Sequence, residues 1–129
     1  MSVFGFIDKI TEFKKDESLT ASYTLTGKEE FLEDHFKGFP VMPGVLLLEM
    51  AKQAAASLLR QSSGEKRPCR LKRAKDVRFD HFVKPGSELK VFVRLLKIES
   101  GASVFDGRID LTSAPFGKVL SANMTLIPV

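Results

Sequence analysis

"VLLLEMAKQAAASLLRQ", residues 45–61, is the segment that decides the fold. It is dense in Leu, Ala, Met, Glu and Lys, which all favour a helix, and Pro43 precedes it where a first turn tolerates proline. The stretch SSG at residues 62–64 provides the stop signal. From Val45 to Leu48 the apolar side chains cover every direction of the first turn, which predicts a helix buried on all sides.

The segments on either side of this helix have the pattern of β-strands. Residues 18–26, SLTASYTLT, alternate apolar and polar side chains with a period of two, and residues 4–13 are the expected hairpin partner. Four more strand-like stretches follow the helix, separated by turn-forming residues, at 71–79, 89–98, 103–112 and 118–127. We therefore expect an α+β fold, with one long central helix wrapped by a curved antiparallel sheet of five or six strands.

Length and composition are those of one ordinary globular domain, residues 1–129, with 43% hydrophobic and 28% charged residues. No run of about 18 apolar residues is present, and the N-terminus lacks the pattern of a signal peptide. These features predict a cytoplasmic protein without a membrane span. Cys69 is the single cysteine, which excludes an internal disulfide and argues against a cysteine metal cluster.

The basic residues behind the net charge of +4 are concentrated in one segment of the chain. Residues 60–78, RQSSGEKRPCRLKRAKDVR, hold eight basic and two acidic residues, and we call this segment the basic strip. It is either a solvated face or a surface for an anionic partner. Nucleic acid is the weaker candidate, because no aromatic residues for base stacking are interleaved with the cations.

Polar residues stand in a chemically suggestive order around the helix start. Glu49 and Gln53 are four residues apart and share a helix face, so the Gln53 amide can hydrogen-bond the Glu49 carboxyl. Considered alone, this face could simply look out to solvent. Upstream, the turn-rich stretch HFKGFPVMPG at residues 35–44 fixes where His35 and the helix start can lie. Gly44 supplies a first-turn N–H that lacks an intrahelical acceptor.

Imidazole, a carboxyl in an apolar setting and a free backbone donor together suit the removal of a proton next to a thioester carbonyl. The stretch from His35 to Gln53, HFKGFPVMPGVLLLEMAKQ, resembles the signature of the β-hydroxyacyl-acyl carrier protein dehydratases of type II fatty acid synthesis. The likeness continues through residues 77–98, VRFDHFVKPGSELKVFVRLLKI. This resemblance implies the hot dog fold, which agrees with the helix and sheet expected from periodicity.

The resemblance also implies an activity: a hydro-lyase that dehydrates (3R)-hydroxyacyl thioesters to trans-2-enoyl thioesters in fatty acid or related lipid synthesis, with no cofactor or metal. His35 would take the C2 proton, and Glu49 would protonate the departing C3 hydroxyl. Gly44 and Val45 would bind the thioester oxygen, with Gln53 beside Glu49. The family's sites form between two subunits, so a homodimer is expected, and a trimer of dimers is possible. Acyl carrier protein or coenzyme A would carry the substrate, and an acidic carrier protein would meet the basic strip.

Two other functions are open. A hot dog thioesterase would use a carboxylate to direct water at the thioester carbonyl, without needing a histidine at position 35. A non-catalytic acyl-thioester-binding protein would keep the apolar channel and tolerate the loss of both polar groups. The other histidine, His81, lies in a strand-to-turn stretch, and we expect it to be structural.

Overall fold

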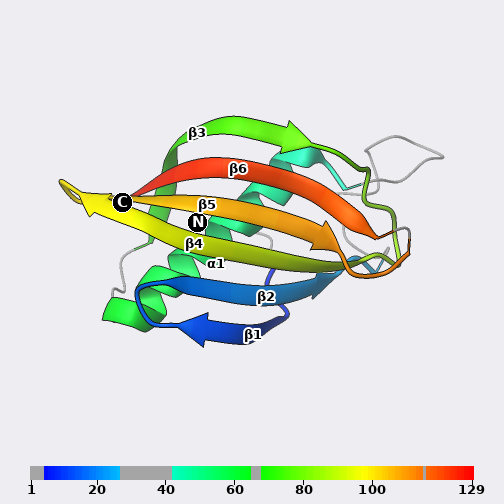
Figure 1. The fold of residues 1–129 in the computed structure, drawn as a ribbon, viewed down its shortest axis with the longest axis horizontal. Coiled ribbons are helices and arrows are strands. Elements are labelled where there is room, and N and C mark those ends of the chain that lie inside the picture. The colour runs from blue at the N-terminus through cyan, green and yellow to red at the C-terminus, as the bar shows by residue number, and fades with distance from the viewer. Residues whose placement is uncertain (1–4, 27–41, 65–67, 115) are drawn as a thin grey trace.

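The computed structural model describes residues 5–26, 42–64, 68–114 and 116–129. This part of the chain comprises one helix, α1 (Gly44–Ser63), and six strands (Figure 1). The strands are β1 (Lys9–Lys14), β2 (Ser18–Thr24), β3 (Cys69–Phe79), β4 (Glu88–Glu99), β5 (Ala102–Leu111) and β6 (Gly117–Pro128). The predicted helix and strands are all present, although β1 begins only at Lys9, so residues 5–8 of the expected 4–13 strand lie outside it.

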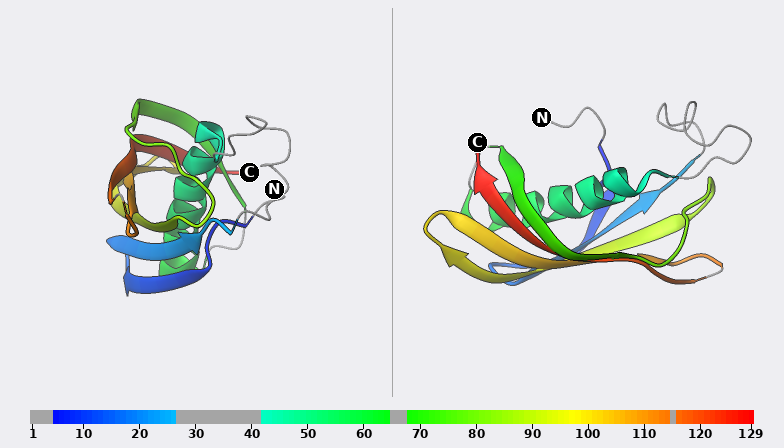
Figure 2. Two further views of the ribbon diagram at one scale, coloured as in Figure 1. Left: turned by 90° about the vertical axis from the view of Figure 1, so that its right-hand side faces the viewer. Right: turned by 90° about the horizontal axis from the view of Figure 1, so that it is seen from above.

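The six strands form one sheet in the order β1-β2-β4-β5-β6-β3, with antiparallel neighbours throughout. β3 follows the helix in the chain, yet it pairs with β6 at the edge opposite β1. Figure 2 shows the sheet curving round α1, which lies on its concave side. The sheet of five or six antiparallel strands wrapped round one long helix is thereby confirmed.

The core lies between the concave face of the sheet and one side of α1. The helix contributes six buried residues at helical spacing: Leu47, Met50, Ala51, Ala54, Ala55 and Leu58. Alternate residues of the strands face them, as in β2, where Leu19, Ala21 and Tyr23 are buried. Small residues bring helix and sheet close together. A Cβ at Gly107 of β5 would lie 2.8 Å from the terminal methyl of Met124, and 3.5 Å from the Cβ of Ala51.

The opposite side of α1 is not covered by the sheet. Val45, in its first turn, is 72% exposed, whereas Leu47 two residues later is buried. The prediction of a helix buried on every side is therefore wrong for the single chain. The sheet covers only one face of α1, and the other face borders a groove. The helix ends as predicted at Gly64, which adopts a left-handed φ of 72° and donates its N–H to the Arg60 carbonyl. Along the described residues, no helix is long and apolar enough to cross a membrane.

Candidate functional site

The uncovered face of α1 borders a groove of about 900 Å³. The N-terminal segment, the start of β3 and the C-terminal Val129 form its other walls. Apolar residues contribute much of the lining, among them Ile7, Leu46, Leu48, Ala56 and Leu71. Glu49, Lys52 and Gln53 lie together on the helix side of the same groove. An apolar channel with a few convergent polar groups is the usual form of a site for a small, largely apolar ligand.

Glu49 and Gln53 meet as their spacing on the helix predicts. The Gln53 Nε2 group donates a hydrogen bond of 2.9 Å to Oε2 of Glu49. Gln53 cannot ionise, so this contact fixes the orientation of the carboxyl without adding a charge. The expected hydrogen bond is confirmed, and Glu49 faces the groove rather than open solvent, with 22% of its side chain exposed.

The amide of Gln53 is itself fixed by the N-terminal segment. The backbone N–H of Phe6 donates to Gln53 Oε1 at 2.8 Å, across 47 positions of sequence. The Phe6 side chain is fully buried and packs edge-on against Tyr23, with ring centroids 5.5 Å apart. Because Phe6 is anchored in the core and occupies the amide oxygen, the NH2 end of Gln53 must turn toward Glu49.

Lys52 completes this cluster. Its Nζ lies 3.2 Å from Oε2 of Glu49, the same oxygen that accepts from Gln53. Only 17% of the Lys52 side chain is exposed. The Glu49–Lys52 contact joins residues three apart on a helix, a spacing at which side chains regularly meet, so the sequence held a signal for it. The role of Phe6 had no such signal, because it depends on a backbone group far away in the sequence.

The start of α1 supplies unpaired backbone donors. The Pro43 carbonyl accepts from the N–H groups of Leu46 and Leu47, at 3.0 and 3.2 Å. The N–H groups of Gly44 and Val45 have no acceptor among the described residues. Phe79, at the end of β3, packs on Gly44, where a Cβ would lie 3.1 Å from its Cε1 atom. This is the donor arrangement that an oxyanion site requires, although the ring of Phe79 borders one side of it.

His35, the expected base, lies outside the described residues. The nearest described residue that follows it is Met42, whose N–H donates to the Val83 carbonyl at 2.8 Å. The other histidine, His81, has the structural contacts expected of it. Its Nδ1 is 2.7 Å from the Lys118 carbonyl oxygen, and its ring packs on Gly117, so it joins the turn after β3 to the start of β6.

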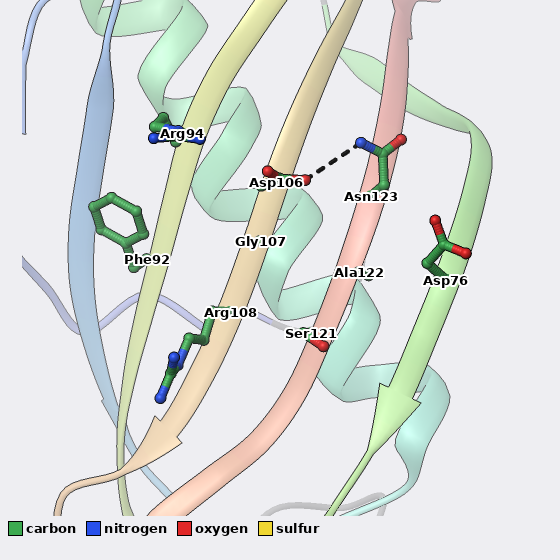
Figure 3. A pocket seen from close by; sticks show the side chains of 9 residues that line it. All are labelled: Asp76, Phe92, Arg94, Asp106, Gly107, Arg108, Ser121, Ala122 and Asn123. Carbon is green, nitrogen blue, oxygen red and sulfur yellow. Dashed lines mark hydrogen bonds between the residues drawn. The ribbon is translucent and has the colours of Figure 1, made fainter.

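A second hollow, of about 430 Å³, lies on the face of the sheet turned away from α1 (Figure 3). Three of its polar side chains have a hydrogen-bond or ion-pair partner, in one case outside the hollow. Asn123 donates to Asp106 at 3.3 Å, and Arg108 pairs with Asp110 at 2.8 Å. This hollow has no connection to Glu49. In the part of the chain that the structure covers, no group of three His, Cys, Asp or Glu side chains is arranged to hold a metal ion.

Comparison with solved structures defines the class of fold. The chain is similar to the dehydratase heterocomplex ApeI:P from Xenorhabdus doucetiae, with a TM-score of 0.78 and 18% identity, covering 97% of this chain and 83% of that one. It is also similar to smu.793 from Streptococcus mutans UA159 bound to acetyl CoA, with a TM-score of 0.72 and 16% identity, covering 100% and 93%. The fold is the hot dog fold.

Sequence relatives define the family within that class. The ApeI-like family, described as ApeI dehydratase, matches residues 11–111. The 3-hydroxyacyl-[acyl-carrier-protein] dehydratase FabZ of Levilactobacillus brevis is 36% identical over 126 residues, covering 95% of this chain and 81% of the relative. FabZ of Coxiella burnetii (strain RSA 331) is 37% identical over 109 residues, covering 81% and 77%. The chain belongs to the ApeI-like dehydratase family, and the resemblance noted from its sequence is confirmed.

Proposed function

We propose that this chain dehydrates 3-hydroxyacyl thioesters to trans-2-enoyl thioesters, the reaction named for its FabZ relatives. The observation that carries the proposal is the Glu49 carboxyl, held by Gln53 in an apolar groove close to the start of α1. A carboxyl so placed can exchange a proton with a substrate whose acyl chain lies along the apolar wall. Because the chain belongs to a dehydratase family, we propose the removal of water as the reaction at this carboxyl.

In the proposed mechanism, His35 removes a proton from C2 of the acyl chain, and the electrons of that C–H bond form the C2–C3 double bond. The C3–O bond breaks, and Glu49 supplies the proton with which the hydroxyl leaves as water. The N–H groups of Gly44 and Val45 are the candidate donors to the thioester oxygen, where negative charge develops as the C2 proton leaves. The positive end of the helix dipole supports the same charge.

The carrier of the acyl chain is proposed to be acyl carrier protein, with coenzyme A as the alternative. Five cations of the basic strip lie exposed along β3: Arg70, Lys72, Arg73, Lys75 and Arg78. Asp76 is the single acid of that strand. Arg70 also lines the groove, so the cationic strand leads to the site that holds Glu49. A positive surface beside the groove favours an acidic protein as the carrier, since complementary charge speeds and orients docking.

A homodimer is the proposed functional unit, and a trimer of such dimers is the larger assembly we expect. Val45 and Val129 both line the groove, and they are 72% and 71% exposed in the single chain. Apolar side chains exposed together beside a site favour cover by a second subunit. Light scattering during size-exclusion chromatography measures the assembly directly, and a protein that stays monomeric at micromolar concentration would contradict this part of the proposal.

The test is hydration of a trans-2-enoyl thioester, the reverse reaction, followed by the loss of enoyl absorbance with both carrier-protein and coenzyme A substrates. Glu49→Gln and His35→Ala should each lower kcat at least about 100-fold, the usual contribution of a general acid or base. Glu99→Gln is the matched control, because Glu99 is also ion-paired to a lysine at 3.2 Å but is 69% exposed at the end of β4. It should keep full activity.

The alternatives predict different products in the same assay. Release of free thiol without hydration would identify a thioesterase, in which Glu49 directs water at the carbonyl. Acyl binding with neither reaction would identify a non-catalytic binder. Hydration that persists in Glu49→Gln would remove this residue from the mechanism while leaving the reaction itself in place.

A further inference from the structure

The two oxygens of the Glu49 carboxyl have different surroundings. Oε2 receives the Gln53 Nε2 group at 2.9 Å and the Lys52 ammonium at 3.2 Å. No group of the described residues hydrogen-bonds Oε1. One oxygen is therefore fastened by two donors, of which one is a cation, while the other is available to a ligand in the groove.

The Glu49–Lys52 pair differs from an ordinary surface ion pair in its exposure. Lys97 and Glu99 at the end of β4 have the same N···O distance of 3.2 Å, but their side chains are 62% and 69% exposed. In the groove, the corresponding values are 17% for Lys52 and 22% for Glu49. Water and salt screen the exposed pair strongly and the enclosed pair much less, so the charge of Lys52 has the larger effect on its carboxylate.

Lys52 is also the cation that faces Glu49 most directly. The other charged or titratable side chains that line the described groove are Arg60 on α1, and Cys69 and Arg70 on β3. None of these forms an ion pair with Glu49. Arg60 lies three turns further along the helix, about 16 Å from Glu49 in the axial direction. Replacing Lys52 therefore removes the cation that pairs with Glu49 and leaves the charged side chains of β3 in place.

We propose that Lys52 is a positioning residue for the dehydration: together with Gln53 it holds Oε2 of Glu49, so that Oε1 exchanges the proton with the substrate. This inference rests on the proposed function, in which Glu49 is the acid. The proton on Oε1 passes to the C3 hydroxyl, the electrons of the C3–O bond leave with water, and a carboxylate remains beside the Lys52 ammonium. In the hydration direction, water returns its proton to Oε1 and its oxygen bonds to C3.

The test compares the wild type with Lys52→Met, Lys52→Arg and Lys97→Met in the enoyl-thioester hydration assay. Lys52→Met removes one of the two donors that hold Oε2 of Glu49, so kcat should fall about tenfold. Lys52→Arg retains a cationic donor and should restore most of the wild-type kcat, and KM should change less than twofold in both. Lys97→Met removes a lysine of equal ion-pair distance and should change nothing.

A second readout does not depend on activity: the NMR signal of the Gln53 side-chain NH2 group, assigned by its loss in Gln53→Met. This signal should move in Lys52→Met, because Gln53 and Lys52 share Oε2 of Glu49, and should stay in place in Lys97→Met. Lys52→Gln, which loses the charge and keeps a polar end, replaces Lys52→Met if that variant fails to fold by circular dichroism.

The outcomes separate the inference from the function on which it rests. A Lys52→Met variant with an unchanged kcat and an unchanged Gln53 signal overturns the inference and leaves the dehydratase intact. An equal loss of kcat in Lys97→Met also overturns it, because the effect would then come from net charge. An inactive wild type refutes the proposed function, and the Gln53 signal alone then decides whether Lys52 positions the carboxyl.

Discussion

Replacing Gln53 with methionine removes the link between the N-terminal segment and the Glu49 carboxyl. Methionine matches glutamine in length and offers neither the NH2 donor nor the strong oxygen acceptor. Two hydrogen bonds are lost, from the Phe6 N–H at 2.8 Å and to Glu49 Oε2 at 2.9 Å, and both are partly buried. The Phe6 N–H loses the acceptor that Gln53 provides, which is the more costly half of the change.

The magnitude follows from these two contacts. A partly buried hydrogen bond contributes about 1 kcal/mol, and one to a charged group somewhat more, so Gln53→Met should lower the free energy of unfolding by about 2 kcal/mol. For a chain of this length, that corresponds to a fall in Tm of about 7 °C. The turnover number should fall about tenfold or more, because the carboxyl loses one of the two donors that orient it.

A double-mutant cycle with Glu49→Gln measures the coupling. The part of the cost that comes from the charged hydrogen bond should disappear when residue 49 is already neutral, so the two substitutions should be non-additive by about 1 kcal/mol. Thermal unfolding followed by circular dichroism gives the stabilities, and the enoyl hydration assay gives the rates. Additive effects within about 0.3 kcal/mol would refute the view that Gln53 acts through Glu49.

Three further perturbations test other parts of the structure. Gly107→Ala should change the free energy of unfolding by less than about 1 kcal/mol, because the only close contact of the new Cβ, at 2.8 Å, is with the flexible end of Met124; a fall in Tm of more than about 5 °C would show that Met124 cannot move aside. The double reversal Lys72→Glu with Lys75→Glu should raise KM about tenfold or more for a carrier-protein substrate and leave KM for the coenzyme A substrate within about twofold; an equal rise for both would place the cations elsewhere in the reaction. Val45→Asp should weaken the proposed dimer, measured by light scattering, and an unchanged mass would locate the interface away from this side chain.

Local patterns in the sequence were sufficient for the secondary structure. The helix predicted over 45–61 extends over Gly44–Ser63, because its composition and its stop signal act within a few residues. The strands after it were located for the same reason, since turn residues separate each alternating stretch from the next. The order of the strands was not predictable in this way. β3 crosses to the edge beside β6, a pairing that depends on contacts across the whole sheet.

The contacts of the candidate site also differ in whether local sequence patterns can predict them. The Glu49–Gln53 contact follows from helical spacing, and the Glu49–Lys52 contact could have been predicted from spacing too, because a residue three positions along lies on the same face. The hydrogen bond from Phe6 could not, since it joins a backbone group to a side chain 47 positions away.

Val45 shows a different limit of sequence patterns. Its apolar neighbours suggested burial on all sides, yet hydrophobicity alone does not say whether a side chain is covered by its own chain or by a second one. The sheet can enclose only one face of a single helix, so the other face borders the groove, which the proposed second subunit would cover. Glu49, to which the sequence assigned a catalytic role, and Val45, which the fold leaves exposed, therefore both line the groove beside α1. This is the arrangement expected of a site that two subunits share, because each chain must offer both its polar groups and an apolar surface to its partner.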